Sequence, residues 1–479
     1  MRTTIAVFLV IALSAHTLWA QSDIFALSGT RVSSILDMAT DSKGNLYITG
    51  LFKETLTLGD KQFNSNNGES FICKLDPNNA ILWSIQIVGS IREIEASDDN
   101  IRVLGQYTKN LTINGTTKTC DFTNSFLACL DTNGNTLWLV DGQATGNVFP
   151  INMTLDKAGN SYIVCSFSES ITLESTLLKK DRDKNAFIAK YNSSGKLVWA
   201  KHITGGDSFI TGVWASDISF DEKNNQLLIS GNFAGECKFG SIPIKTRKLV
   251  FGPGEVLWGN EVFLAKYSSE GNCTSVNSII TEANVNYLET DSQGNIYLGG
   301  HFKGEVAPTK TADNTGIAYF CGNQKIKTTI DPDMGPSEEG YILKLNSQNQ
   351  FQWIVRNEGR STDRIIAFTF DADGNIYACS FAHVEIGISG KTKKIPIQAV
   401  QGTGEELYKG EIIITKINAE GEPEWLKMCG GVGQDNAYDI CLVNNTLKVA
   451  GLLSGNVTFE NKNYFISGKY NGVIISLEL

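Results

Sequence analysis

The segment Asp371-Ala-Asp-Gly-Asn-Ile-Tyr377 decides the fold, because this chain of 479 residues repeats it. The pattern Asp-x-x-Gly-Asn-x-Tyr recurs from Asp41, Asp156 and Asp291, and degenerate copies occupy residues 98–102, 221–227 and 444–448. An apolar run precedes each Asp and an alternating run follows it, as expected of two strands joined by a tight turn. The chain therefore carries seven copies of one β-hairpin.

A third and a fourth strand follow the hairpin in most copies. The third carries a Lys in five copies, as in Phe187-Ile-Ala-Lys-Tyr191, and a Trp stands twelve residues after the start of that strand in five copies. These Trp residues are Trp83, Trp138, Trp199, Trp353 and Trp425. Because the Lys and the Trp recur with the repeat, we interpret both as structural, the Lys on a strand face and the Trp packed between sheets.

Seven units of four strands predict a β-propeller, in which each unit forms one radial blade; an open solenoid is the alternative. The seventh unit ends at Leu479 before its fourth strand, and Asp23-Ile-Phe-Ala-Leu-Ser-Gly29 stands just before the first unit. A strand near Ile24 to Gly29 can complete the last blade, whereas a solenoid would leave an exposed strand edge. The predicted fold class is all-β: a seven-bladed propeller of four-stranded blades, closed by an N-terminal strand, in one domain over residues 21–479.

The repeat resembles the SBBP-type β-propeller repeat of secreted bacterial proteins. The resemblance rests on Asp-x-x-Gly-Asn-x-Tyr-x-x-Gly, on Phe187-Ile-Ala-Lys-Tyr191 followed by Gly195 and Trp199, and on Gly205-Gly-Asp207 and Gly430-Gly-Val-Gly-Gln-Asp435. It covers nearly the whole chain after residue 20. The resemblance implies the propeller fold and implies no shared catalytic residue.

The first 20 residues have the pattern of a secretory signal peptide. Arg2 precedes the apolar run Ile5-Ala-Val-Phe-Leu-Val-Ile-Ala-Leu13, and the small residue Ala20 precedes Gln21. This run is too short to span a bilayer, and no later stretch reaches the roughly 18 consecutive apolar residues that a membrane helix needs. We expect a soluble bacterial protein that is secreted, periplasmic or displayed at the cell surface.

Charge and cysteine usage narrow the classes of partner. Without Arg2, the 41 basic residues become 40 against 51 acidic ones, a net charge of −11, which argues against nucleic acid as a partner. The ten Cys residues show no Cys-x-x-Cys spacing, and Cys165 and Cys379 stand at matching places in strands, where free buried thiols are expected. A calcium loop at Asp371 and Asp373 is disfavoured, because most other copies have Lys, Gln or Ala where a second carboxylate would be needed. We predict no metal and no cofactor, and we expect a monomer.

Three adjacent units carry long insertions. From the second strand to the third the interval is 32, 41 and 33 residues in units four, five and six, against 21 or 22 in the others. Equivalent loops of a propeller project from equivalent places, so the insertions are expected to gather over one sector, often the binding side of a repeat protein. The predicted ligand-binding residues are Trp258, Tyr319, Phe320, Asp331, Asp333, Glu405, Glu406 and Tyr408. Such residues can bind a sugar, a cation or a protein surface; the alternative is that the loops pack on each other.

Catalytic motifs are scarce, and we predict no catalytic residue. After residue 20 the only histidines are His202, His301 and His383, and neither Gly-x-Ser-x-Gly nor His-Glu-x-x-His occurs. We therefore expect a non-catalytic propeller that binds a glycan or protein through units four to six. The alternative is an extracellular polysaccharide lyase or hydrolase, which would require His301, His383 and carboxylates of units five and six to meet in one pocket. A structural spacer is a third hypothesis.

Overall fold

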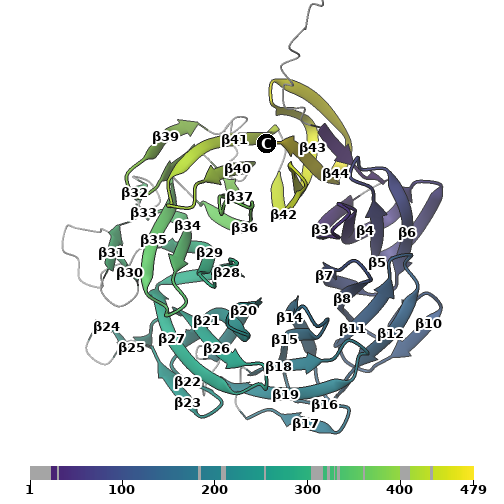
Figure 1. The fold of residues 1–479 in the computed structure, drawn as a ribbon, viewed down its shortest axis with the longest axis horizontal. Helices are drawn as coiled ribbons and strands as arrows, with labels where there is room; N and C mark the ends of the chain where they lie inside the picture. The colour runs from purple at the N-terminus through teal and green to yellow at the C-terminus, as the bar shows by residue number, and fades with distance from the viewer. Residues whose placement is uncertain are drawn as a thin grey trace, which may run out of the picture.

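The computed structural model describes residues 23–29, 32–181, 185–205, 212–246, 248–252, 255–303, 317–320, 324–327, 330–331, 335–359, 362–383, 385–399, 410–431 and 435–479. These residues form antiparallel β-sheets, and no helix occurs among them. Figure 1 shows the sheets arranged side by side around a common centre, as in a β-propeller. Within these ranges there is no helix long and apolar enough to cross a membrane.

The strands lie in layers from the centre of the ring outward (Figure 1). The innermost strands are β3 (Val32–Thr40), β7 (Ser90–Ala96), β14 (Val148–Leu155), β20 (Gly212–Asp221), β28 (Ala283–Thr290), β36 (Arg364–Phe370) and β42 (Asn436–Val443). The second strands are β4 (Leu46–Leu58), β8 (Asn100–Tyr107), β15 (Ser161–Phe167), β21 (Gln226–Ala234), β29 (Ile296–Lys303), β37 (Ile376–Ala382) and β43 (Thr446–Phe459). The third strands are β5 (Lys61–Leu75), β11 (Asn124–Asp131), β18 (Asn185–Tyr191), β26 (Glu261–Ser268), β34 (Glu338–Leu345), β40 (Glu411–Ile417) and β44 (Lys462–Glu478). The fourth strands are β6 (Ile81–Ile87), β12 (Thr136–Asp141), β19 (Leu197–Thr204), β27 (Cys273–Thr281), β35 (Phe351–Glu358) and β41 (Pro423–Gly431).

The two ends of the described chain lie in the same part of the ring. β1 (Asp23–Ala26) pairs antiparallel with β44, with Ile24 opposite Ile475. The next strand, β2 (Ser28–Gly29), pairs with the outer part of β4, with Gly29 opposite Leu56. Residues 23–29 therefore join the last repeat to the first.

The connection between the second and third strands holds a further hairpin, which the sequence patterns did not predict. The described hairpins are β9 (Asn110–Ile113) with β10 (Thr116–Thr119), β16 (Ser170–Leu173) with β17 (Thr176–Lys179), β22 (Glu236–Phe239) with β23 (Ile242–Lys245), β30 (Ile317–Phe320) with β31 (Gln324–Lys327), and β38 (Glu385–Ser389) with β39 (Lys394–Ala399). β22, β30 and β38 pair with the fourth strand of the preceding repeat, β19, β27 and β35 respectively. Each repeat thus covers part of its neighbour's strand edge, which protects that edge from pairing with another chain.

Short strands outside this pattern are β13 (Gln143–Ala144), β24 (Lys248–Gly252) with β25 (Glu255–Trp258), and β32 (Ile330–Asp331) with β33 (Gly335–Pro336). β13 pairs with β16, so the hairpin of the third repeat also contacts the chain just after β12.

The repeated turn is held together by its aspartate. In the sixth repeat, Asp371 Oδ1 accepts hydrogen bonds from the backbone N–H of Asp373 (3.0 Å) and of Asn375 (2.9 Å). Asp371 Oδ2 accepts from the Asn375 amide (2.8 Å) and the Tyr377 hydroxyl (3.1 Å). The conserved spacing within the repeat is therefore the spacing of a turn that satisfies its own polar groups.

The recurrent Lys and Trp are structural, as predicted. Lys190 Nζ lies 3.9 Å from Asp156 of the turn and 4.9 Å from the centre of the Tyr162 ring. The Trp138 indole N–H donates to the Ser193 carbonyl oxygen of the next repeat at 3.1 Å. The Trp residues therefore tie neighbouring sheets together.

The hydrophobic core lies between neighbouring sheets. One cluster combines Tyr162 and Ile188 of the third repeat with Ile218 and Phe263 of the fourth, all buried. The described cysteines are free, and Cys165 and Cys379 are fully buried in strands, as expected; Cys321 lies outside the described residues.

Candidate functional site

A β-bulge at one place in every innermost strand orients side chains toward the centre of the ring. The pairing of β3 with β4 shifts between Ile35 and Asp37, and the same shift occurs in β7, β14, β20, β28, β36 and β42. The residues just after the bulge are Asp37, Glu93, Asn152, Asp217, Tyr287, Ala367 and Asp439. Side chains two positions later on a strand share the same face, which adds Ala39, Glu95, Thr154, Ser219, Glu289, Thr369 and Cys441.

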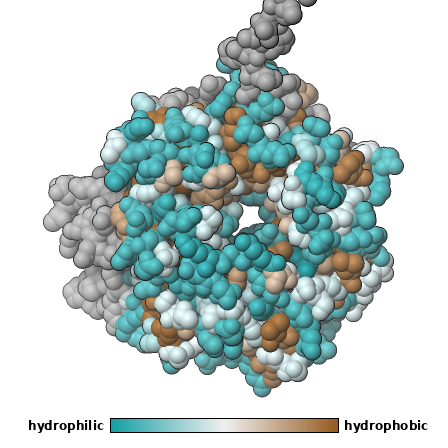
Figure 2. Space-filling view, in the orientation of Figure 1, coloured by the Kyte–Doolittle hydropathy of each residue, from teal (hydrophilic) through white to brown (hydrophobic). Residues whose placement is uncertain are grey.

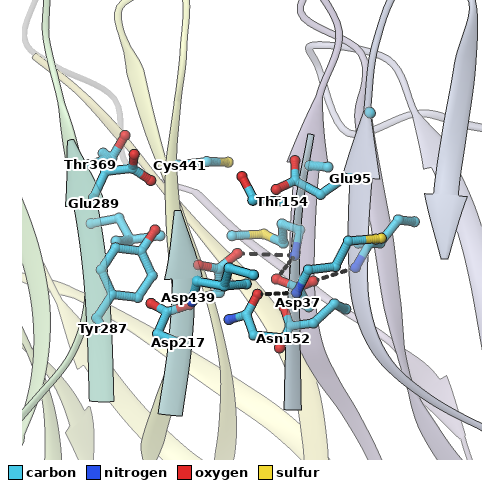
Figure 3. A pocket seen from close by; sticks show the side chains of 18 of the residues that line it. Asp37, Glu95, Asn152, Thr154, Asp217, Tyr287, Glu289, Thr369, Asp439 and Cys441 are labelled. Atoms are coloured by element: carbon cyan, nitrogen blue, oxygen red, sulfur yellow. Dashed lines mark hydrogen bonds between the residues drawn. The ribbon is translucent and has the colours of Figure 1, made fainter. Parts of the chain in front are cut away.

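These two sets form two layers around a space that we call the central channel. Figure 3 shows Asp37, Asn152, Asp217, Tyr287 and Asp439 in one layer and Glu95, Thr154, Glu289, Thr369 and Cys441 in the other. The hollow between them has a volume of about 400 Å³. An adjoining hollow of about 660 Å³ extends toward the end where the innermost strands begin, and Arg92, Arg364 and Tyr438 line its mouth. Figure 2 shows an opening at the centre of the ring with a largely hydrophilic rim.

Three carboxylates of the first layer connect adjacent repeats. Asp37 Oδ2 accepts the backbone N–H of Ile94 at 2.6 Å, and Asp217 Oδ2 accepts that of Leu288 at 2.6 Å. Asp439 Oδ2 accepts the backbone N–H of Met38 at 3.0 Å. Each aspartate thus binds the innermost strand of the next repeat, so part of the channel's acidity serves the fold.

Burial and mutual repulsion raise the carboxyl pKa values in the channel. Burial raises the pKa of Asp37 to about 6, despite its backbone hydrogen bonds. Burial, together with the charges of Glu289, Asp439 and Asp217, raises the pKa of Glu95 to about 8. Glu95 is therefore largely protonated at neutral pH, and the channel holds fewer negative charges than its composition suggests.

The channel is lined by polar side chains that can donate or accept hydrogen bonds. Glu289 accepts a hydrogen bond from the Ser219 hydroxyl at 3.2 Å and from the Thr290 backbone N–H at 2.9 Å. Glu95 makes no hydrogen bond to another described residue, so a protonated Glu95 can offer a donor to a bound group. Across the described ranges no three His, Cys, Asp or Glu side chains are grouped to hold a metal ion.

The sequence-predicted ligand-binding residues lie largely outside the part of the chain whose side chains the structure describes. Asp333, Glu405, Glu406 and Tyr408 are not among the described residues. For the others only the strands are described, namely β25 with Trp258, β30 with Tyr319 and Phe320, and β32 with Asp331. Their convergence remains a prediction.

The three histidines are hydrogen-bonded to neutral groups. His202 Nε2 lies 2.7 Å from Asn185 Oδ1, His301 Nε2 lies 3.1 Å from Asn284 Nδ2, and His383 Nδ1 lies 3.2 Å from the Thr362 carbonyl oxygen. Burial lowers the pKa of His301 to about 4, with a further contribution from the Arg364 charge. His301 is therefore neutral at pH 7 and is held by an amide.

One carboxylate of unit five lies near a histidine, and it is held in an ion pair. The charge of Glu338 acts on the pKa of His301, but the Glu338 carboxylate forms an ion pair with Arg364 at 2.8 Å. The fully buried Glu339 pairs with Arg356 at 3.3 Å. This sector thus contains charged groups with fixed partners.

The central channel was missed by the sequence reading, although a signal for it exists. An Asp or Glu interrupts an otherwise apolar innermost strand at Asp37, Glu93, Asp217, Glu289 and Asp439. Aligning the repeats at these positions would have placed the side chains on one inward face, provided that the bulge was also known.

Comparisons with known proteins give no family. No family model matches the chain. An uncharacterized WD repeat-containing protein of Acanthamoeba polyphaga mimivirus is 22% identical over 201 residues, which are 40% of this chain and 13% of that protein. The chain thus matches a small fraction of this curated relative's length.

Solved structures similar to the chain include BamB from Moraxella catarrhalis, with a TM-score of 0.35, 11% identity, and 93% of this chain and 83% of that chain covered. A catalytically inactive virginiamycin B lyase from Staphylococcus aureus with quinupristin has a TM-score of 0.44 and 8% identity over 96% of this chain and 100% of that chain. Similarity at this level identifies neither a ligand nor an activity.

Proposed function

We propose that this chain is an exported, non-catalytic propeller of seven four-stranded blades that binds a glycan or protein ligand on the face where the innermost strands begin. Closure of the ring by the N-terminal strand is part of the proposal. The pairing of β1 with β44 and the hydrogen bond from Met38 to Asp439 support it, because both join the last repeat to the first.

One observation carries the binding function: the repeats share the residues that build the fold and differ at the rim of the channel. The turn Asp, the Lys and the Trp recur with fixed contacts. The rim residue two positions before each bulge is Ser34, Ser90, Phe149, Trp214, Asn284, Arg364 or Asn436. The structural residues recur in most repeats, whereas this rim position varies among Ser, Phe, Trp, Asn and Arg, and we take that variation as support for a role in binding.

The long insertions emerge on the same face as this rim. Innermost strands begin, second strands end and third strands begin at one end of each sheet, because adjacent strands are antiparallel. The insertions of units four to six connect second to third strands. We therefore keep Trp258, Tyr319, Phe320, Asp331, Asp333, Glu405, Glu406 and Tyr408 as proposed ligand-binding residues on this face; β25 and β30, which carry three of them, lie at the outer edge of the ring (Figure 1).

The bonding of the histidines favours binding over catalysis. A general base needs a hydrogen-bond path to the group that it deprotonates and a pKa near the working pH. The pKa of His301 lies near 4, and its hydrogen-bond partner is the Asn284 amide. We therefore propose no catalytic role for the three histidines.

A binding screen with matched variants tests this proposal. The purified chain is tested against oligosaccharide and exported-protein arrays, together with Arg92→Glu at the channel mouth and a replacement of residues 401–408 by a Gly-Ser linker. Lys157→Glu is the control, because Lys157 is exposed in the repeated turn at the other end of the sheets. We expect Arg92→Glu and the replacement of residues 401–408 each to weaken binding at least tenfold, and Lys157→Glu to leave it unchanged. Equal binding by all variants, or turnover of a bound ligand, would contradict the proposal.

A further inference from the structure

A second pocket lies at the rim between the fourth and fifth repeats, beside the channel mouth. It has a volume of about 450 Å³ and is lined by Trp214, Ser216, Asn232, Asn260, Asn284, Val285, Asn286 and His301. Ser216, Val285 and Asn286 also line the channel mouth, so the two hollows adjoin. The volume lies within the range of about 300–1,000 Å³ typical of small-molecule sites. We call this hollow the amide pocket.

The amide pocket is built from equivalent positions of two adjacent repeats. Trp214 stands opposite Asn232 in the β20–β21 pair, and Asn284 stands opposite His301 in the β28–β29 pair. Asn260 precedes β26 and bridges the two repeats, because its amide donates to the Ala283 carbonyl oxygen at 3.1 Å. The pocket therefore rests on strand ends, which hold side chains more rigidly than loops do.

Trp214 gives the pocket an aromatic wall. Its side chain is 38% exposed, unlike the buried aromatics of the core. Its indole N–H has no hydrogen-bond partner among the described residues. Since the fold leaves this large apolar ring in solvent, stacking against a ligand would bury apolar area and could engage the indole N–H.

The amides form a connected network with hydrogen-bonding capacity left over. Asn232 donates to the Ala283 carbonyl oxygen at 2.5 Å and to Asn260 Oδ1 at 3.2 Å, and Asn284 Nδ2 lies 3.1 Å from His301 Nε2. Asn286 donates to the Ile365 carbonyl oxygen at 2.9 Å, which leaves Asn286 Oδ1 unpaired among the described residues. One N–H of Asn284, Asn286 Oδ1 and Ser216 Oγ therefore remain as fixed donors and acceptors.

The lining of the amide pocket is uncharged. No Asp, Glu, Lys or Arg is among its lining residues. The only titratable side chain is His301, which is 8% exposed and whose pKa is lowered to about 4 by burial. An ionised ligand would find no counter-charge in the pocket, so the chemistry suits a neutral, hydroxyl-rich ligand.

We propose that the amide pocket binds a neutral sugar unit, with one face of the sugar ring against Trp214 and its hydroxyls on Asn284, Asn286 and Ser216. This inference rests on the proposed binding function and names its ligand class. A hydroxyl donates and accepts at once, which matches a lining of amides and a serine hydroxyl. The sequence predicted aromatic binding residues in the insertions, whereas Trp214 lies in the innermost strand β20.

Calorimetric titration with neutral oligosaccharides tests the sugar site. Maltotetraose, cellotetraose, xylotetraose and mannotetraose are the probes, with tri-galacturonate as the charged comparison. We expect at least one neutral probe to bind, and Trp214→Ala and Asn284→Ala each to weaken that binding at least tenfold. Phe149→Ala is the control, because Phe149 occupies the equivalent rim position of the third repeat and is 42% exposed. Tri-galacturonate should bind at least tenfold more weakly than the best neutral probe.

The possible outcomes distinguish the sugar site in the amide pocket from the general binding function. Unchanged circular dichroism and Tm are expected for Trp214→Ala, because Trp214 is exposed. Circular dichroism checks that Asn284→Ala, which removes the hydrogen bond to His301, remains folded. The sugar site is overturned if no neutral probe binds at millimolar concentration, or if Trp214→Ala weakens binding no more than Phe149→Ala does. Binding of a protein ligand that is insensitive to Trp214→Ala would overturn the sugar site and leave the binding function intact. Chromatographic conversion of a bound probe, lost in Trp214→Ala, would support the sugar site and contradict the non-catalytic function.

Discussion

Asp439 Oδ2 accepts a hydrogen bond from the backbone N–H of Met38 at 3.0 Å, although the two residues are 401 positions apart. The same contact joins Asp37 to Ile94 and Asp217 to Leu288 between consecutive repeats. The contact between the two ends of the chain is thus one more copy of a contact between neighbours.

Removing the Asp439 acceptor should weaken the junction between the last and first repeats. Burial and the charge of Asp37 raise the pKa of Asp439 well above its ordinary value, so the comparison is cleanest at mildly acidic pH, where charge repulsion is smaller. Asp439→Ala leaves the Met38 N–H with only Asp37, so a loss of about 1–3 kcal/mol in the free energy of unfolding is expected. Asp439→Asn keeps an acceptor oxygen and should match the wild type. Urea denaturation of the three proteins measures the difference, and equal losses for Ala and Asn would refute the role of the hydrogen bond.

The channel carboxyls should make the protein more stable at mildly acidic pH than at pH 8.5. The pKa of Glu95 is about 8 in the folded chain, against 4.5 for an ordinary Glu, so the folded state binds more protons between these values. Its contribution is fully present below about pH 4.5 and is lost as the pH rises through 8. The Tm should therefore fall between pH 5.5 and pH 8.5.

Glu95→Gln isolates this effect. The substitution removes the titration and keeps the shape, so the variant should be more stable than the wild type by about 1–3 kcal/mol at pH 8.5 and by almost nothing near pH 4.5. Glu478→Gln, at an exposed position with no ion pair among the described residues, is the control and should leave the difference between pH 4.5 and pH 8.5 as in the wild type. A parallel pH profile for Glu95→Gln and the wild type would contradict the assignment.

Gly271 should be intolerant of a side chain because of the Trp of the preceding repeat. A Cβ there would lie 2.8 Å from Trp199 Cδ2 and 2.9 Å from Lys201 Cε, and the residue has a φ of +80°. Gly115 has nearly the same φ, +81°, with nothing within 4 Å of a Cβ. Both Gly→Ala variants carry the backbone strain, but only Gly271→Ala crowds the indole, so it should lose about 1–3 kcal/mol more in urea denaturation. Equal losses would show that the Trp–Gly packing contributes little.

The sequence predicted the features that recur in most repeats. The turn, the strand-three Lys and the strand-four Trp follow from local chemistry, and the structure confirms their roles at Asp371, Lys190 and Trp138. A recurring local motif can be read because each copy repeats the same physical solution.

The channel and the outer hairpins could not be read in this way. Whether Asp37 faces the channel depends on a bulge that shifts the pairing of β3 by one residue, and one residue reverses the face of a strand. The hairpin strand β22 has only four residues and pairs with β19 of the preceding repeat. Such long-range pairings depend on how neighbouring repeats pack together and leave no local signature. The amide pocket was missed for a similar reason, because Trp214 and Asn284 come together only across two repeats.

Asp363 presents a buried carboxyl that should limit stability above neutral pH. Its side chain is fully buried, and neither carboxyl oxygen has a hydrogen-bond partner among the described residues. Burial raises its pKa well above the ordinary value, and the charges of Glu339 and Glu385 raise it further. Above about pH 4 the unfolded chain releases the Asp363 proton while the folded chain keeps it. The free energy of unfolding therefore falls as the pH rises from about 4 toward the folded pKa of Asp363.

Asp363→Asn removes this titration at nearly constant size. The free energy of unfolding at pH 8 should increase by about 1–2 kcal/mol, and the gain should shrink as the pH falls toward about 4, where the carboxyl is also protonated in the unfolded chain. Asp435 is the matched control, because it occupies the equivalent buried position of the next repeat but accepts the backbone N–H groups of Gly431 (2.9 Å) and Ser454 (3.2 Å). Asp435→Asn loses one of these acceptors, so it should give no gain. Urea denaturation of the wild type and both variants at pH 8 and pH 4 measures the six free energies, and a loss of stability in Asp363→Asn at pH 8 would show that Asp363 has a partner on which the fold depends.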